Sequence, residues 1–291
     1  MYELVRLTDK CYYIESPAKI GLIKTGENEV CLIDSGNDKD AGRKVRQLLD
    51  ANGWMLKAIY NTHSNADHIG GNKYLQSQTG CKIYAPGIEY DFACHPILEP
   101  SFLYGGYPSR DLRHKFLMAQ ESDCLPLTVD SLPEGMEIIP LPGHFFDMVG
   151  FKYDGVAYIA DCLSSNITLD KYGIGFVYDI ESYLSTLETV KAMDSTFFVP
   201  SHAEVCEDIG ELAQHNIDKV NEICKKIVDI CSAPMIFEDI LKRLFDEYAL
   251  KMTFEQYCLV GSSVRSYLSY LKDKGALNVI FEDNYLKWHK I

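Results

Sequence analysis

The most constraining feature of this chain is the segment at residues 61–72, NTHSNADHIGGN. In an extended loop alternate side chains face the same way, so metal-ligating side chains can converge here as a helix begins. The four candidate ligands are His63, Asn65, Asp67 and His68. The next two glycines, Gly70 and Gly71, have no side chain and let the helix start pack closely on neighbouring backbone. Taken alone, the segment fits a polar helix cap with solvated histidines equally well.

Three more residues of the metal-ligating type stand where predicted strands end. They are His144, Asp161 and His202, and each follows a short apolar run. Asp34 closes another predicted strand in the same manner. Such strand ends gather at one edge of a sheet, so residues far apart in the sequence can meet there. We therefore predict that these residues join the 61–72 segment in a single site.

Together these motifs resemble the metallo-β-lactamase superfamily in their order and spacing. The hydrolases of that superfamily include glyoxalase II and many esterase-like enzymes. The resemblance spans residues 1 to about 215 and rests on five separated motifs, which makes it specific. It implies an α+β fold, the αββα sandwich, with two adjoining metal sites. The first site would use His63, Asn65 and His144, the second Asp67, His68 and His202, and Asp161 would bridge them.

The chain departs from the family's pattern at position 65, where the family usually has His and this chain has Asn65. An amide oxygen is a neutral and weak ligand, so the first site should bind zinc less tightly than the second. We expect an asymmetric centre with a filled second site, in preference to a purely mononuclear enzyme. Zinc is the leading candidate, as one or two ions, and iron or manganese also suits the ligands.

The resemblance implies a metal-dependent hydrolase in which a metal-bound hydroxide attacks the substrate. Asp67 and Asp161 are the predicted catalytic residues, whereas Asp34 is expected to support His63 or the ligand loops from outside the metal's own ligands. The predicted substrate is a small ester, thioester or lactone, because aromatic residues of segment 87–127 can line an apolar pocket. Ordinary core packing is the alternative role for these aromatics, which are Tyr90, Phe92, Phe102, Tyr104, Tyr107 and Phe116.

Three rival functions remain open from the sequence. A phosphodiesterase or nuclease of the same fold is one, but the net charge of -14 disfavours nucleic acid as a partner. The residues from 233 to 291 are also electrically balanced, with eight basic and eight acidic side chains. A flavodiiron-like di-iron redox protein is the second rival, although it needs a flavin domain for which the chain has no room. A non-catalytic metal-binding sensor is the third.

The pattern of apolar residues predicts two domains. Residues 1–220 form the catalytic domain, with a helix at 38–51 and an insertion at 87–127 that we expect to act as a lid or pocket wall. Residues 233–291 form a small winged-helix-like domain with helices at 237–250 and 262–274 and a hairpin at 277–288. The catalytic domain's predicted strands lie at 3–7, 11–15, 20–25, 29–34, 57–61, 82–85, 136–141, 149–153, 156–160 and 196–200.

Location and partners follow from what the sequence lacks. The first residues show no basic start followed by an apolar run, and nowhere do 18 apolar residues run together, so we expect a cytoplasmic protein without a membrane partner. The ten cysteines contain no C-x-x-C pair and are expected to be buried thiols. We expect a small-molecule substrate as the partner, with a homodimer as one option for the C-terminal module.

Overall fold

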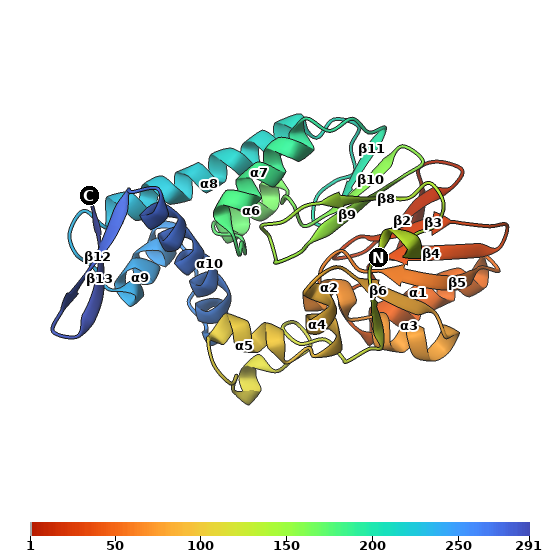
Figure 1. Cartoon of the computed structure of the whole chain (residues 1–291), viewed down its shortest axis with the longest axis horizontal. Coiled ribbons are helices and arrows are strands. Elements are labelled where there is room, and N and C mark those ends of the chain that lie inside the picture. Colours follow the sequence, from red (N-terminus) through yellow and green to blue (C-terminus); the bar gives the residue numbers. More distant parts are fainter. Residues whose placement is uncertain (1) are drawn as a thin grey trace.

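The computed structural model describes residues 2–291 and contains two facing sheets with helices on both outer faces (Figure 1). The first sheet has seven strands in sequential order: β1 (Glu3–Arg6), β2 (Cys11–Glu15), β3 (Ile20–Lys24), β4 (Glu29–Ile33), β5 (Met55–Tyr60), β6 (Lys82–Ala85) and β7 (Cys124–Pro126). The second has the order β11-β10-β9-β8, with β8 (Glu137–Pro140), β9 (Val149–Tyr153), β10 (Val156–Ala160) and β11 (Phe197–Pro200). The predicted αββα sandwich is confirmed.

Apolar side chains from both sheets fill the space between them. Ile23 and Ile33 from the first sheet and Phe151 and Tyr158 from the second are at most 3% exposed. Gly21 allows the close approach, because a Cβ there would lie 2.7 Å from the ring of Tyr158. Burying one such large apolar side chain stabilises the fold by roughly 1.5–3 kcal/mol. This central core fixes the two sheets relative to each other. It therefore also fixes the positions of the strand ends that carry the site.

The outer face of the first sheet is covered by α1 (Lys39–Ala51) and α3 (Asn72–Thr79). Strands β1 to β4 are antiparallel, whereas β4 to β7 are parallel and need these crossover helices. Asp38 caps α1 by accepting hydrogen bonds from the amides of Asp40 and Ala41. The helix predicted at residues 38–51 therefore forms, with its first residue acting as the cap.

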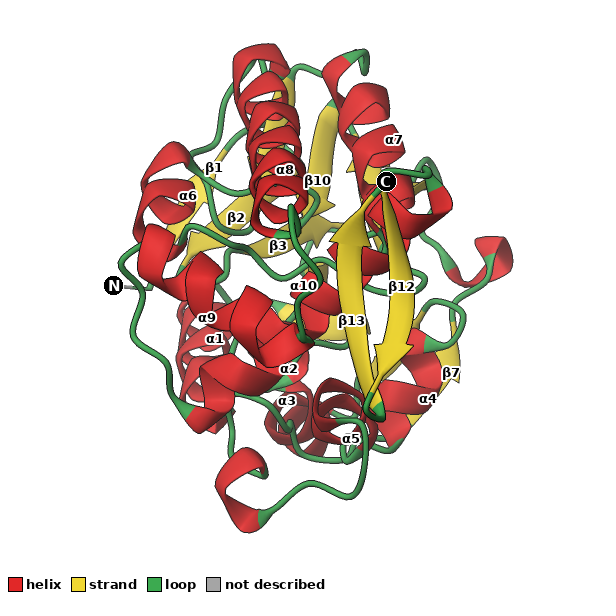
Figure 2. Ribbon diagram, turned by 90° about the vertical axis from the view of Figure 1, so that its left-hand side faces the viewer, coloured by secondary structure: helices red, strands yellow, loops and turns green. Residues whose placement is uncertain are grey.

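The outer face of the second sheet is covered by α7 (Ile180–Lys191) and the long helix α8 (Gly210–Ile230), with α6 (Asn166–Tyr172) beside them (Figure 2). Both long helices bury an apolar face against β10 and β11. Leu187 of α7 and Ala213 of α8 are fully buried in this layer. Helix α8 runs on beyond the sheet toward the C-terminal part of the chain (Figure 1).

The C-terminal part contains α9 (Phe237–Glu247), α10 (Phe254–Asp273) and a hairpin of β12 (Leu277–Glu282) and β13 (Tyr285–Lys290). Two helices and a hairpin were predicted, but α10 starts at Phe254, earlier than the predicted residue 262. Thr253 caps it by accepting from the amide of Gln256. The helices share one continuous apolar core with α7 and α8, which ties this part to the sandwich. The winged-helix description and the homodimer stay predictions.

The segment at residues 87–127 contains α4 (Glu89–Cys94), α5 (Leu98–Tyr104) and a short 3₁₀ turn at Arg110–Leu112. Its last residues form β7, which pairs with β6 at the edge of the first sheet. The boundaries of the insertion at 87 and 127 stay a prediction. Helix α5 packs against α10, with Leu103 and Cys258 buried at the contact (Figure 1). The insertion thus joins the first sheet to the C-terminal helices.

Two further properties concern the whole described chain. Among residues 2–291 no helix is both long enough and apolar enough to cross a membrane. All ten cysteines carry free thiols, and seven of them are buried, in agreement with the expectation of buried thiols.

Candidate metal centre

Five segments meet at one edge of the sandwich and bring all the predicted site residues together. Each segment follows a strand, and one of them continues into the short helix α2 (Ala66–Ile69). Asp34 follows β4, His63 and Asn65 follow β5, Asp67 and His68 lie in α2, His144 follows β8, Asp161 follows β10 and His202 follows β11.

One cluster consists of Asp67, His68, Asp161 and His202, whose donor atoms all lie within 4.8 Å of one another. His202 Nε2 lies 3.3 Å from Asp67 Oδ2 and 3.2 Å from Asp161 Oδ2. The other ring nitrogen of His202 lies 3.0 Å from the carbonyl oxygen of Pro17, which fixes the ring's orientation. Two imidazoles and two carboxylates form a donor set suited to zinc, iron or manganese.

A second cluster contains His63, His144 and Asp161, again with donor atoms within 4.8 Å of one another. Asn65 belongs to it, because its Oδ1 lies 3.2 Å from His144 Nε2. Asp161 is common to both clusters: its Oδ2 lies 3.7 Å from His144 Nε2. The arrangement therefore offers two adjoining groups of donors that share one carboxylate.

Three buried polar atoms at this point have no hydrogen-bond partner within residues 2–291. They are His63 Nε2, His68 Nε2 and Asp161 Oδ1. His68 Nε2 and Asp161 Oδ1 lie only 3.1 Å apart, yet they are not aligned for a hydrogen bond. Leaving such groups unpaired in a protein interior costs roughly 1–3 kcal/mol each. Divalent cations held at the two clusters would satisfy all three atoms, so the residues present fit a metal centre.

Asp34 supports the site through contacts with its neighbours. The backbone at Asp34 is left-handed, with φ of 64°, and its side chain is almost completely buried. Its carboxylate accepts hydrogen bonds from the amide and hydroxyl of Thr62 at 2.8 and 2.7 Å and lies 2.8 Å from His68 Nδ1. Thr62 Oγ1 in turn lies 2.9 Å from His63 Nδ1. Asp34 thus orients His68 directly and His63 through Thr62.

The two glycines after α2 permit the close packing that the sequence suggested. A Cβ at Gly70 would lie 2.4 Å from the backbone of Asn37, and one at Gly71 would lie 2.3 Å from the carbonyl oxygen of Ser35. Both distances are too short for any side chain. These contacts press the start of the ligand helix against the loop after β4, which is the loop that carries Asp34.

Glu99 of α5 was not predicted as part of the site. Its side chain is buried, and its Oε1 accepts a hydrogen bond from Asn65 Nδ2 at 2.9 Å. This contact leaves the amide oxygen of Asn65 facing His144 and the first cluster. Burial raises the pKa of Glu99 well above its ordinary value, although the hydrogen bond from Asn65 opposes the shift. The insertion thereby determines which atom Asn65 presents to a cation.

Glu89 of α4 holds the neighbouring residue of the same loop. Its carboxylate accepts hydrogen bonds from the amide and hydroxyl of Ser64 and, at 3.0 Å, from the amide of Asp147. Complete burial raises the pKa of Glu89 to about 7, despite these hydrogen bonds. The loop before α2 therefore rests on two buried acidic side chains from the insertion. Nothing in their sequence surroundings distinguished them from surface glutamates.

The imidazoles of the centre differ in their protonation. Burial, reinforced by neighbouring His68, lowers the pKa of His63 well below its ordinary value. Burial also opposes protonation of His202, but the carboxylates of Asp161 and Asp67 outweigh it and raise the pKa of His202 to about 10. The pKa of His68 is raised for the same reason. A cation must displace the protons on these two rings, so its binding weakens as the pH falls.

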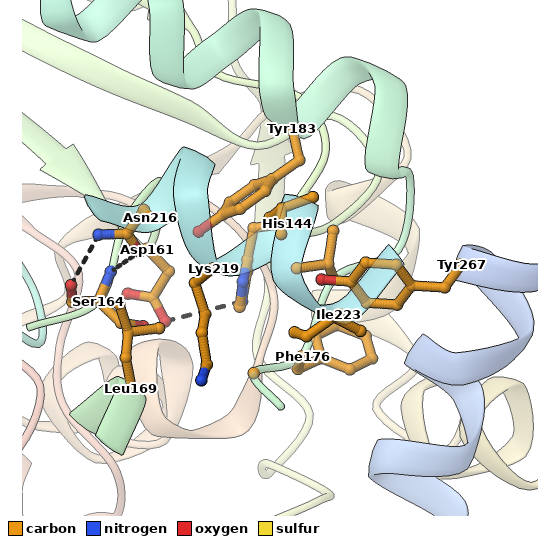
Figure 3. Close-up of a pocket in the computed structure, with 13 residues that line it drawn as sticks. His144, Asp161, Ser164, Leu169, Phe176, Tyr183, Asn216, Lys219, Ile223 and Tyr267 are labelled. Atoms are coloured by element: carbon orange, nitrogen blue, oxygen red, sulfur yellow. Dashed lines mark hydrogen bonds and ion pairs between the residues drawn. The ribbon is translucent and has the colours of Figure 1, made fainter. Parts of the chain in front are cut away.

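A small cavity opens beside the clusters, with His144 and Asp161 in its wall (Figure 3). Its other walls come from α6, α7, α8, the loop before α7 and the C-terminal helix α10. None of the six aromatic residues proposed from segment 87–127 lines it. Phe92 and Phe102 pack against Phe145 and Phe146 behind His144, while Tyr107 is exposed. Phe92 is buried, so the core-packing alternative holds for this residue.

Residues 14–202 match the family described as the metallo-beta-lactamase superfamily. The chain belongs to this superfamily. The match covers both donor clusters from His63 to His202, and it confirms the resemblance inferred from the motifs.

The curated relatives are hydroxyacylglutathione hydrolases. The one from Methylobacillus flagellatus is 25% identical over 127 residues, which cover 43% of this chain and 41% of that protein. The one from Pseudomonas putida is 28% identical over 155 residues, covering 53% of this chain and 48% of the relative. The one from Maricaulis maris is 49% identical over 120 residues, which cover 39% of this chain and 36% of that protein. The chain thus aligns with less than half the length of each of these relatives.

Two solved structures resemble the whole chain. A metallo-beta-lactamase family protein from Thermus thermophilus is 17% identical, with a TM-score of 0.73 over 100% of this chain and 98% of that one. A beta-lactamase domain protein from Burkholderia ambifaria is 15% identical, with a TM-score of 0.74 over 99% of this chain and 94% of that one. At these identities the likeness shows the fold alone, and it includes the C-terminal helices.

Proposed function

We propose that this protein is a metal-dependent hydrolase of small esters, thioesters or lactones. The observation that carries the proposal is the pair of donor clusters around Asp161, with three buried donor atoms that no described side chain satisfies. A divalent cation held there would lower the pKa of a coordinated water to about 7 and would polarise the carbonyl oxygen of a substrate. Membership of the superfamily and the hydroxyacylglutathione hydrolase relatives support this class of reaction.

The role that each residue of the centre would have follows from how exposed its side chain is. The Asp161 side chain is 10% exposed and contacts both clusters, which suits a bridging ligand. The Asp67 side chain is 40% exposed, so it can also accept a hydrogen bond from the attacking water and orient it. His68 and His63 are fully buried and serve as ligands. Asp34 orients the ring of His68 directly and the ring of His63 through Thr62.

We further propose zinc as the metal, with unequal occupancy of the two clusters. The cluster of Asp67, His68, Asp161 and His202 would hold the first ion tightly. The cluster with Asn65 would bind a second ion more weakly, because it offers a neutral amide oxygen where the family usually has an imidazole.

Ten free thiols suit a reducing compartment, which favours the cytoplasm.

Activity assays can separate this function from its rivals. The protein, loaded with zinc, iron or manganese in turn, is assayed with an ester, a thioester, a lactone and a phosphodiester. We expect turnover of at least one of the first three, abolished by a chelator and restored by the metal. Turnover of the phosphodiester alone would instead establish a phosphodiesterase, and a redox-active iron centre without hydrolysis would favour the di-iron class. Metal binding with no turnover of any of them would favour a sensor.

A further inference from the structure

The C-terminal hairpin of β12 and β13 has one free edge. Among residues 2–291 these two strands form a sheet of their own, in which β12 pairs with β13 alone. The outer edge of β13 is occupied, because the amide of Trp288 donates to the carbonyl of Met235 at 2.8 Å and its carbonyl accepts from the amide of Met235 at 2.9 Å. The hairpin lies at one end of the molecule (Figure 1). The outer edge of β12 is therefore open to another strand.

The turn of the hairpin determines which backbone groups of β12 point outward. Both residues of the turn at 283–284 have positive φ, of 50° and 63°, which is the geometry of a two-residue hairpin turn. Glu282 and Tyr285, which flank this turn, therefore bond to each other across the hairpin. Because bonded and outward-facing residues alternate, the amides and carbonyls of Val279 and Phe281 point away from β13. No other backbone group of residues 2–291 bonds to them.

Strand β12 lacks the features that normally keep an edge strand from pairing. Such strands usually carry a lysine, a proline or a bulge. Strand β12 has the sequence LNVIFE, with no lysine or proline, and pairs with β13 in a continuous register without a bulge. Ile280 is 37% and Phe281 74% exposed, and their neighbours on β13, Tyr285 and Leu286, are 59% and 40% exposed. The edge thus combines unpaired backbone with exposed apolar side chains, a combination that favours association.

The distribution of charge favours a second copy of the chain as the partner. The chain has 28 basic and 42 acidic side chains, but residues 233–291 contain eight of each. The whole excess of negative charge therefore lies in residues 1–232, which hold 20 basic and 34 acidic side chains. Two copies repel each other least when their C-terminal parts meet. A basic partner would instead be attracted to the rest of the molecule.

We propose that β12 pairs in antiparallel fashion with β12 of a second copy, about a two-fold axis at Ile280, so that one continuous sheet crosses both chains. Val279 of each chain then lies opposite Phe281 of the other, and each such pair exchanges two hydrogen bonds through its outward backbone groups. The two Ile280 side chains meet on the axis. The dimer neither requires nor alters the metal centre, so it is independent of the proposed function.

The side chains of β12 select this register over its neighbours. With the axis at Ile280, Glu282 of one chain lies opposite Asn278 of the other. The side-chain oxygen of Asn278 accepts from the amide of Val279 at 2.9 Å, which leaves the Asn278 nitrogen free to donate to the carboxylate of Glu282. The amide of Val279 exchanges this local bond for the carbonyl of the second strand. An axis at Glu282 would instead place two carboxylates opposite each other, which is unfavourable.

Analytical ultracentrifugation of the full-length chain tests the dimer and its register. We expect a reversible monomer–dimer equilibrium with a Kd of roughly 1–100 µM, because a strand edge forms an interface at the small end of the range. In Ile280→Lys two ammonium groups would meet on the axis, and in Ile280→Glu two carboxylates, so each variant alone should stay monomeric. An equimolar mixture of these two variants should form the dimer again. Ile167→Lys, at an 80% exposed position on α6, should dimerise like the wild type.

A second variant does not alter the charge. Phe281→Pro removes an outward amide that the hairpin itself does not use, so it should abolish the dimer while the thermal unfolding curve stays that of the wild type. A wild-type chain that remains monomeric up to 100 µM would overturn the proposal. A dimer that persists in both Ile280 variants would overturn the choice of this edge. Two monomeric Ile280 variants that do not associate with each other would refute the two-fold register. Binding of an unrelated extended peptide by a chain that stays monomeric would overturn the second copy as the partner.

Discussion

The two donor clusters share Asp161 but are supported in different ways. In the cluster with Asp67 and His202, all donors are charged carboxylates or imidazoles, and Asp34 at the end of β4 orients His68. In the other cluster one donor is the neutral amide of Asn65, whose orientation depends on Glu99 from the insertion. The first arrangement belongs to the sandwich itself. The second depends on Glu99 of helix α5, which lies outside both sheets.

This difference shows how one position can be altered without dismantling the centre. Replacing an imidazole by an amide weakens one group of ligands, yet the amide still presents an oxygen because Glu99 takes up its nitrogen. The shared carboxylate of Asp161 and the other cluster keep their contacts, since these contacts do not involve Asn65. The structure therefore predicts two cation sites of unequal strength.

Removing the shared carboxylate should have the largest effect. Asp161→Asn takes away a charged donor from both clusters at once, so we expect both cations to be lost and kcat/KM for the best ester to fall on the order of 10³-fold. Metal analysis and steady-state kinetics measure the two effects. Asp170→Asn, at an exposed position on α6, is the matched control. A variant at 161 that keeps both its metal and its turnover would contradict the bridging role.

The buried carboxyl of Glu89 should make stability depend on pH. Its pKa is raised to about 7 in the folded protein from an ordinary value of 4.5, so its contribution is fully present below pH 4.5 and is lost as the pH rises through 7. The largest loss is about 3 kcal/mol. Urea unfolding of the metal-free protein at pH 5 and pH 8 should show a smaller difference for Glu89→Gln than for the wild type. Identical pH dependence in the two proteins would exclude Glu89 as its source.

Converting Asn65 to histidine, the residue that the family usually has, should reduce the difference in zinc affinity between the two clusters. In Asn65→His the imidazole would replace the amide oxygen, and Glu99 could accept from its second ring nitrogen. We expect the weaker zinc site to tighten by roughly 10- to 100-fold, with the stronger site unchanged. Calorimetric titration of the metal-free variant gives both values of Kd. A weaker site that stays as it was would mean that position 65 does not limit it.

Removing the Glu99 side chain, which orients Asn65, should increase the difference in zinc affinity between the two clusters. Glu99→Ala frees the amide to rotate, so we expect the weaker site to lose affinity by about tenfold. The stronger site should keep its Kd, because Asp34 and Pro17 hold its histidines independently. Glu121→Ala, an exposed change in the same insertion, controls for general effects. Equal losses at both sites would indicate a disturbed fold and would contradict a local role for Glu99.

Much of the fold and the centre was predictable because it depends on local patterns. Short apolar runs indicated the strands of both sheets, and the ligands follow directly after them. The NTHSNADHIGGN segment contains four candidate ligands within six residues, and the structure divides them between the two donor clusters. The two glycines at its end were also interpretable, since only glycine fits where Gly70 and Gly71 meet backbone.

The parts that escaped prediction depend on contacts between distant segments. Glu89 and Glu99 resemble surface residues until α4 and α5 fold over the ligand loop and bury them. Tyr183 and Tyr267 lie on helices far apart in the sequence, and nothing in the sequence indicated that both would line the cavity beside His144. The aromatic residues of the insertion were an obvious choice for a pocket, but they pack behind the centre or point to solvent.

Titration of the metal-free protein with zinc, followed by calorimetry, tests the central claim most directly. We predict two binding events per chain whose Kd values differ by at least about tenfold, the tighter one lost in His202→Ala and the weaker one retained there. Two ions bound with equal affinity would contradict the asymmetry, and the absence of any binding would contradict the metal centre itself.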